Sequence, residues 1–307
     1  MNSFDLHMHS CYSNDGEFSP EVLIHMAKEA KLTTIALSDH NTPKGIDEMC
    51  SFGKAAGIRV IPAMEFDTLF EELEVHVLGY GIDYTQPYFQ ELYAVLDERK
   101  KAVHLKRVEK IKEVFNLDID AQALLKQYAG KNPFPDIVHH IMEQYKDKEE
   151  FKEYQPGGRR ADPQPVNFYW DMCSAQKPCY VRVEYPSLKD TVQRIHEAGG
   201  IAVLAHPWLN FYQEEGRLER ALKEGIDGIE AYSNYHEPKH NRYYDSYCRK
   251  HDVLMTCGSD FHGKMKPKIR MGEYGYEKED GEELLQAFLK RLNLYDWQFH
   301  SRSTKQK

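Results

Sequence analysis

Short apolar segments alternate with longer amphipathic segments along most of this chain, and this alternation limits the folds that it can adopt. The segments that predict buried strands are Phe4–His7, Thr34–Leu37, Arg59–Ala63, Glu74–Gly79, Ile201–Leu204, Gly228–Ala231 and Val253–Thr256. The segments that predict helices between them are Pro20–Leu32, Pro43–Ala56, Leu188–Ala198, Arg217–Lys223, Lys239–His251 and Glu282–Leu292. Strands that alternate with helices indicate an α/β fold with a parallel sheet. For 307 residues, a closed or nearly closed β/α barrel is favoured over an open sheet.

One part of the chain, residues 87–176, breaks this alternation because it contains no convincing strand. The helices predicted there are Tyr88–Phe115, Ala121–Tyr128 and Ile137–Tyr145. A loop rich in Pro, Gly and Arg follows them, and it is either a substrate lid that carries Arg159 and Arg160 or a plain surface loop. We therefore predict a barrel of residues 1–86 and 177–307 with an inserted helical subdomain at 87–176.

Composition and charge exclude several classes of function. The formal net charge of −9 argues against a surface for duplex DNA. No apolar run approaches the ~20 residues that cross a bilayer, and the N-terminus begins a strand without the regions of a signal peptide. The six cysteines are sparse and lack Cys-x-x-Cys spacing, which indicates reduced thiols. We expect a cytoplasmic protein that binds neither duplex DNA nor a membrane, and the sequence leaves its oligomeric state open.

Polar side chains that can bind a metal follow several of the predicted strands. The first strand leads into His7-Met8-His9, and side chains two apart on a strand point the same way. Such a pair alone is more often ordinary surface, but similar groups recur at other strands: Ser38-Asp39-His40, Glu65, His76, His206 and Asp260-Phe261-His262. Active sites of β/α barrels lie at the carboxyl ends of the strands. Because buried ionisable groups are costly unless paired or metal-bound, we expect these groups to form a metal centre.

These motifs, in this order, resemble those of the PHP (polymerase and histidinol phosphatase) superfamily. The motifs that match are His7-x-His9, Ser38–Thr42, Glu65, His76, Ala205-His206-Pro207 and Gly258–His262. The segments Ala198–Pro207 and Gly228–His236 are similar to the stand-alone metal-dependent phosphoesterases of that superfamily. Those include enzymes that act on nucleoside 3′,5′-bisphosphates and on the 5′ ends of short RNAs. The resemblance implies a distorted TIM-like barrel of seven strands that holds two or three divalent ions.

The resemblance also assigns metal ligands residue by residue. A first ion would take His7, His9, Glu65 and Asp260. A second ion would share Glu65 and add His76 and His206. A third ion, completing a trinuclear centre, would take His40 and His262 with a ligand from the loop after His9, where Asp-Gly order favours Asp15 over Asn14. That loop is one residue longer than the usual pattern. Imidazole and carboxylate ligands suit Mn²⁺, Fe²⁺ or Zn²⁺.

The reaction that the resemblance implies is hydrolysis of a small phosphomonoester by a metal-activated hydroxide. The substrate would be a nucleoside 3′,5′-bisphosphate or an RNA 5′ end. The predicted catalytic residues are His236 and the two ligands Glu65 and Asp260. His236 would donate a hydrogen bond to the phosphate or act as the general acid, and the alternative is that it is an ordinary loop histidine. Asp5 and Asp39 are expected to orient ligating imidazoles.

Residues that bind the rest of the substrate are harder to assign. Relatives that act on nucleotides carry an Arg-Pro-His run in the insertion, where this chain has Phe134-Pro135-Asp136. Arg159, Arg160 and Arg182 are the candidate replacements. Two other functions stay open: a phosphatase for another small phosphomonoester, such as histidinol phosphate, and a non-catalytic metal-bound PHP module. The full ligand set and the lack of room for a polymerase domain favour an enzyme.

Overall fold

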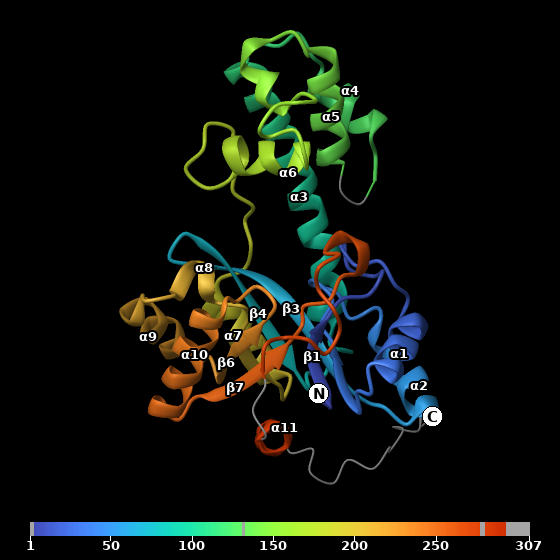
Figure 1. Cartoon of the computed structure of the whole chain (residues 1–307), viewed down its shortest axis with the longest axis vertical. Coiled ribbons are helices and arrows are strands. Elements are labelled where there is room, and N and C mark those ends of the chain that lie inside the picture. The colour runs from blue at the N-terminus through green and yellow to red at the C-terminus, as the bar shows by residue number, and fades with distance from the viewer. Residues whose placement is uncertain (1–2, 131–132, 277–279, 293–307) are drawn as a thin grey trace. The chain divides into compact units, whose positions relative to one another are not determined.

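The computed structural model describes residues 3–130, 133–276 and 280–292 (Figure 1). The chain divides into two units, which we call the barrel unit (Met1–Tyr93 with Tyr185–Lys307) and the inserted unit (Ala94–Glu184). None of the described helices has the length and apolar content to span a bilayer. The six cysteines, all within the described ranges, form no disulfide.

Seven strands of the barrel unit form one sheet in which their order follows the sequence. The strands are β1 (Phe4–Met8), β2 (Thr34–Leu37), β3 (Arg59–Phe70), β4 (Leu73–Tyr80), β5 (Ile201–Leu204), β6 (Gly228–Ser233) and β7 (Leu254–Gly258). The sheet nearly closes on itself, because Met8 pairs in parallel with Phe261 and the His9 N–H donates to the Phe261 carbonyl at 2.9 Å. The predicted α/β barrel of seven strands is confirmed.

The fourth strand departs from the parallel sheet that the alternation predicts. β3 and β4 form a hairpin whose register pairs Ala63 with Tyr80 and Asp67 with His76, and β4 is antiparallel to β5 as well. The prediction of an all-parallel sheet is therefore wrong at β4, because apolar runs mark a strand but not its direction. β3 also continues past Ala63 to Phe70. Consequently the first half of β4 lies at the barrel end where the parallel strands have their carboxyl ends.

Helices cover the outside of the barrel, and Figure 1 shows α1 and α2 on one flank of the strands and α9 and α10 on the other. The helices of this unit are α1 (Pro20–Glu29), α2 (Ile46–Ala56), α7 (Leu188–Glu197), α8 (Trp208–Phe211), α9 (Glu215–Lys223), α10 (Pro238–His251) and α11 (Gly281–Arg291). The sequence explains their ends. The Ser19 hydroxyl caps α1 by accepting the Val22 N–H, and Gly57 ends α2 in the left-handed conformation. Apolar side chains such as Leu23 and Ile24 pack α1 into the barrel core.

The described residues of the inserted unit form helices joined by loops, and they contain no strand. Its helices are α3 (Pro87–Val114, which begins in the barrel unit), α4 (Ala121–Gln127), α5 (Phe134–Gln144) and α6 (Gln164–Phe168), with a 3₁₀ helix at Glu149–Tyr154 and a π-helical turn at Tyr169–Cys173. The unit has its own core of buried side chains, which includes Ile111, Ile137, Phe151 and Phe168. A set of apolar contacts of this kind lets the unit hold its shape without a sheet.

Candidate metal centre

Nine side chains predicted as metal ligands meet at one end of the barrel. Within each of three groups, one ligand atom per residue lies within 4.8 Å of the others. The groups are His7, His9, Glu65 and Asp260; Glu65, His76 and His206; and His9, Asp15, His40 and His262. The first two groups have the same members as the first two predicted ion sites, and the third adds His9 to the predicted set. Their service as ligands stays a prediction.

Glu65 lies at the centre of this arrangement. Its Oε2 is 3.1 Å from the Nε2 atoms of both His7 and His9. Its Oε1 is 3.0 Å from His76 Nδ1 and 2.9 Å from His206 Nε2. Burial alone would raise the pKa of Glu65, but the imidazoles of His40, His7 and His76 outweigh it and hold that pKa well below its usual range. Each carboxylate oxygen therefore faces a different group of nitrogens, which is the geometry of a bridging ligand.

Asp260 supplies the oxygen that best fits a cation. Its Oδ1 is 3.1 Å from His7 Nε2 and 3.0 Å from His9 Nε2, yet it is buried and makes no hydrogen bond within the described chain. A buried oxygen without a hydrogen bond is costly. Two imidazole nitrogens and two carboxylate oxygens suit Mn²⁺, Fe²⁺ or Zn²⁺. The residues present therefore fit a divalent ion in the first group.

The backbone of the site is also unusual. Both His206 (φ 23°) and Asp260 (φ 55°) have positive φ values, which non-glycine residues seldom adopt. Such strain is typical of positions where a side chain is held for function. Gly258, at the end of β7, is required for space, since a Cβ there would lie 2.3 Å from the His7 Cβ. The close packing at Gly258 lets the end of β7 approach β1 beside the predicted ligands.

The loop after β1 contributes Asp15 and not Asn14. Asp15 Oδ2 is 3.0 Å from His262 Nε2 and 3.7 Å from His40 Nε2. Asn14 instead accepts a hydrogen bond from the Tyr93 hydroxyl at 2.7 Å. Burial would raise the pKa of Asp15, but the neighbouring imidazoles of His40 and His262 hold it well below its usual range. The geometry thus favours the Asp-Gly alternative of the two that the sequence offered.

A fourth group, which is not among the predicted ion sites, joins Asp67 to His40 and His76. Asp67 Oδ1 is 3.1 Å from His40 Nδ1 and 3.6 Å from His76 Nε2. Glu65 and Asp67 are two apart on β3, so their side chains lie on the same face of the strand. That spacing was visible in the sequence, but the predicted strand ended before it.

Glu230 on β6 orients two of the predicted ligands, and it was also missed. Its Oε1 accepts a hydrogen bond from His7 Nδ1 at 2.9 Å, and its Oε2 accepts the His206 backbone N–H at 2.8 Å. A carboxylate on Nδ1 fixes the tautomer whose Nε2 lone pair can bind a metal. Burial would lower the pKa of His7, but Glu230, followed by Asp260 and Glu65, raises it well above its usual value.

The expectation that Asp5 and Asp39 orient ligating imidazoles is wrong. Asp5 accepts the backbone N–H groups of Ser259 at 2.9 Å and Gly272 at 2.7 Å, and burial raises its pKa to about 6. Asp39 accepts both the backbone N–H and the hydroxyl of Ser10 at 2.6 Å. Both carboxylates hold loops in place, because these hydrogen bonds join them to backbone N–H groups and not to an imidazole.

Lys266, which no sequence motif indicated, places a cation against the predicted ligands of the barrel unit. Its Nζ is 3.2 Å from Asp260 Oδ2, 3.1 Å from His262 Nε2 and 4.8 Å from the centre of the Tyr235 ring. It follows the short 3₁₀ turn Gly263–Met265. An ammonium in this place can hold a phosphate oxygen beside the ions.

His236 is buried after β6, and its hydrogen bonds fix its tautomer. Its Nδ1 is 3.1 Å from both the Ala231 carbonyl and Asn241 Oδ1, so Nδ1 carries the proton. Its Nε2 is buried and has no hydrogen-bond partner within the described chain. Burial lowers the pKa of His236 to about 3, so the neutral ring presents a lone pair at Nε2. Its role as a hydrogen-bond donor to the phosphate or as the general acid stays a prediction. Either role requires that Nε2 gain a proton.

The three candidate arginines lie in the inserted unit. Arg160 forms a two-pronged ion pair with Asp171, from Nε at 2.8 Å and from Nη2 at 2.7 Å. Arg159 pairs with Glu153 and is exposed. Arg182 Nε lies 3.6 Å from Glu184 Oε1. Their contact with a substrate stays a prediction.

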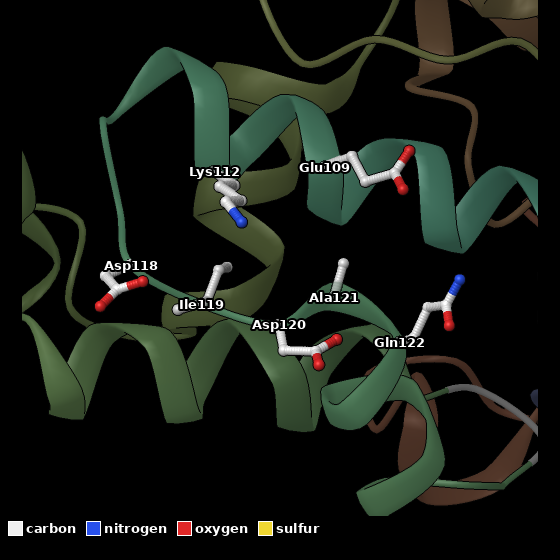
Figure 2. Close-up of a pocket in the computed structure, with 7 residues that line it drawn as sticks. All are labelled: Glu109, Lys112, Asp118, Ile119, Asp120, Ala121 and Gln122. Carbon is white, nitrogen blue, oxygen red and sulfur yellow. The ribbon is translucent and has the colours of Figure 1, made fainter.

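A hollow of about 480 Å³ lies in the inserted unit between α3 and the start of α4 (Figure 2). Its charged lining residues are Glu109, Lys112, Asp118 and Asp120. The Asp120 side chain is already used to cap α4 by accepting the Ala123 N–H at 3.0 Å. The hollow has no histidine or cysteine lining, so we place the functional site at the metal centre.

Comparisons with known proteins agree with this geometry. The chain is 29% identical over 270 residues to a 5′-3′ exoribonuclease of Haemophilus influenzae, with 84% of this chain and 89% of the relative covered. It is 26% identical over 271 residues to a 3′,5′-nucleoside bisphosphate phosphatase of Chromobacterium violaceum, with 85% and 88% covered. It is 25% identical over 267 residues to a phosphoribosyl 1,2-cyclic phosphate 1,2-diphosphodiesterase of Eggerthella lenta, with 85% and 94% covered.

A solved structure and a family model complete the comparison. The structure is that of a candidate metal-dependent phosphoesterase from Bifidobacterium adolescentis, with a TM-score of 0.67, 24% identity, and 94% of this chain and 96% of that chain covered. At this identity the likeness shows the fold. The model of the PHP domain matches residues 5–158, just over half of the 307 residues. The motifs, the barrel and this match lead to one conclusion: the chain belongs to the PHP domain family.

Proposed function

We propose that this protein is a metal-dependent phosphoesterase that hydrolyses a small phosphomonoester of a nucleotide or of an RNA 5′ end. The observation that carries the proposal is the position of Glu65, whose two carboxylate oxygens face two separate groups of imidazoles. This is the ligand arrangement that two neighbouring divalent ions require. The relatives named exoribonuclease and nucleoside bisphosphate phosphatase support the class of substrate.

In the proposed reaction, the residues of the metal centre have different roles. Divalent ions held there would polarise the phosphoryl oxygens and lower the pKa of a bound water. The carboxylates of Glu65 and Asp260 would offset the positive charge of an ion in the first group. Glu230 keeps His7 in the tautomer whose lone pair is at Nε2. Lys266 offers an ammonium to a non-bridging oxygen as negative charge moves onto it. His76 and His206 complete the second group.

The experiment that tests the function is a substrate screen of the purified protein loaded with Mn²⁺, Fe²⁺ or Zn²⁺. The panel contains a nucleoside 3′,5′-bisphosphate, a 5′-phosphorylated RNA oligonucleotide, histidinol phosphate, p-nitrophenyl phosphate and bis(p-nitrophenyl) phosphate. We expect the highest kcat/KM for the bisphosphate or the RNA and loss of turnover with a chelator. A preference for histidinol phosphate would favour the alternative of a small-molecule phosphatase. If no substrate is turned over with any of the metals, the alternative of a non-catalytic metal-bound module is favoured.

Replacement of Lys266 should separate phosphate binding from metal binding. Because a charge-assisted hydrogen bond contributes about 1.5–3 kcal/mol, Lys266→Met should lower kcat/KM by about tenfold to a hundredfold. Metal content should stay unchanged, and both are measured on the same preparation. The matched control is Lys264→Met, since Lys264 is exposed and pairs with Glu17 at 2.8 Å. A normal kcat/KM for Lys266→Met, or an equal loss in the control, would remove Lys266 from the site.

Replacement of Arg160 tests the inserted unit as a source of substrate contacts. The hydrogen bonds of Arg160 use its Nε and Nη2, and its Nη1 takes no part in them. A guanidinium with a free N–H group suits a phosphate oxygen. Arg160→Ala should raise KM for a nucleoside 3′,5′-bisphosphate about tenfold and leave KM for p-nitrophenyl phosphate unchanged.

The matched control for Arg160 is Asp171→Asn, which breaks the same ion pair but keeps the guanidinium. It should leave both KM values unchanged. If the two variants behave alike, the arginine acts through the fold of its loop and not on the substrate.

A further inference from the structure

The inserted unit contains a buried arginine without a counter-ion. Arg107, on α3, is 7% exposed and forms no ion pair with any described residue. Its Nε is buried without a hydrogen-bond partner, and its one hydrogen bond runs from Nη2 to the Val181 carbonyl at 3.4 Å. Arginine stays charged at any physiological pH, so it cannot escape the cost of burial by losing its proton. A buried charge with no partner is among the most costly features in a fold.

Two aromatic rings hold the Arg107 guanidinium in place. Its central carbon is 5.1 Å from the centre of the Phe134 ring and 5.4 Å from that of Tyr169. Ring faces attract a cation, but they carry no net charge and accept no strong hydrogen bond. The rings therefore fix the direction of the guanidinium, and they leave its buried Nε–H without an acceptor. A fixed fork of N–H donors is the geometry that binds a phosphate group.

A second group without a partner lies one turn away on the same helix. The His104 ring stacks on the same Phe134 ring, with centroids 6.1 Å apart, and His104 Nδ1 is buried without a hydrogen-bond partner in the described chain. Burial, with the nearby charges of Arg107 and Lys100, lowers the pKa of His104 to about 4. A neutral imidazole always has one N–H to donate to an anion.

The charged groups around this pair are mainly cationic, because Arg107 and Lys100 act on His104 more strongly than the Asp97 carboxylate does. Cys173 and Cys179 hydrogen-bond to each other, and this hydrogen bond lowers the pKa of the Cys179 thiol. Lys110 adds a further cation, whose Nζ donates to the Tyr180 carbonyl at 2.8 Å. The local balance is therefore positive, and both unpartnered groups lie against one ring.

We propose that Arg107 and His104 form an anion site in the inserted unit that binds a phosphate group, separate from the ions of the barrel unit. The phosphate is either the free anion or the phosphomonoester of a nucleotide, since the same N–H donors recognise both. The site needs no metal. Its test therefore does not depend on the proposed hydrolysis, and either proposal can fail without the other.

The test measures phosphate binding by the full chain after its metals have been removed with a chelator. Isothermal titration with inorganic phosphate should give one site per chain, and phosphate should raise the melting temperature. Arg107→Met keeps an unbranched apolar side chain but removes the charge and the N–H donors, so it should weaken binding at least about tenfold. His104→Leu should weaken it to a smaller degree. Lys264→Met, which removes an exposed lysine outside the predicted ligand groups, should bind phosphate like the original protein.

The outcomes are distinct. No binding to the metal-free protein, equal binding by Arg107→Met, or loss of binding in Lys264→Met would each overturn the site. If Arg107→Met does not fold, Arg107→Lys takes its place and should show weaker binding, because an ammonium lacks the planar fork. Cys179→Ser should bind phosphate normally, and loss of binding in that variant would contradict the proposal. Binding of AMP as well as phosphate assigns the site to a phosphomonoester, and binding of phosphate alone assigns it to the free anion.

Discussion

Glu65→Gln should yield a folded protein that has lost both its metal and its turnover. The carboxylate is buried between two groups of imidazoles, and each of its oxygens faces one group. An amide has one oxygen acceptor and no charge, so it cannot balance two cations at once. Removal of a residue that only supports a metal ligand lowers metal affinity by up to about a hundredfold. Because Glu65 is itself a predicted ligand, we expect its replacement to lower metal affinity by at least that factor. Metal per chain after dialysis and kcat at saturating metal measure the two effects.

The control for this variant is Glu74→Gln. Glu74 lies 3.8 Å from His76 Nε2 but is half exposed, and it belongs to none of the ligand groups. It should keep metal and turnover. Asp260→Asn should behave like Glu65→Gln, whereas Asp15→Asn should empty mainly the group of His40 and His262. Full metal content with a near-normal kcat in Glu65→Gln would show that this carboxylate does not bridge two ions.

Glu230→Gln should weaken metal binding without abolishing catalysis. Glu230 touches no predicted ion site directly, but it accepts hydrogen bonds from His7 Nδ1 and from the His206 backbone N–H. In the variant, one side-chain oxygen becomes an NH₂ group that faces a donor. Loss of such support for a ligand costs about 10- to 100-fold in metal affinity. We therefore expect the metal concentration for half-maximal activity to rise by that factor.

Excess metal should restore most of the kcat of Glu230→Gln, and this rescue separates a positioning role from a catalytic one. A role in packing alone would lower the melting temperature of the metal-free protein and leave the metal titration unchanged. Glu230→Asp provides a further comparison, because it keeps the charge but shortens the reach to His7. A loss of kcat that no metal concentration restores would assign Glu230 a part in the chemistry itself.

The barrel could be predicted because its strands are buried on both faces, which makes each a short apolar run such as Ile201–Leu204. The direction of β4 could not be predicted, since a hairpin and a parallel neighbour have the same apolar pattern. The end of β3 was placed too early for a related reason. Glu65 and Asp67 break the apolar run, and a polar residue inside a strand looks like the end of that strand unless a metal site accounts for it.

The predicted ligands converge because strand ends place them there, but the residues that support them were harder to find. Glu230 is a single acidic residue inside an apolar strand, and only the fold brings it to His7. Lys266 lies in a loop, where nothing in the sequence distinguishes it from the exposed Lys264. Asp5 and Asp39 were given the wrong partners, because the sequence near a histidine does not reveal which backbone N–H groups need an acceptor.

The seam of the barrel has a consequence for how metal and fold depend on each other. The seam is the place where β1 meets the end of β7, and few backbone hydrogen bonds join the two there. Asp5 and Ser259, which hydrogen-bond across it, are 254 positions apart in the sequence. An ion held by His7, His9 and Asp260 would act as a cross-link between the first and last strands of the barrel. At a free concentration a hundred times its Kd, an ion that binds only the folded state adds about 2.7 kcal/mol to the free energy of unfolding. The metal supply of the cell would then govern how long this protein survives proteolysis as well as how fast it works.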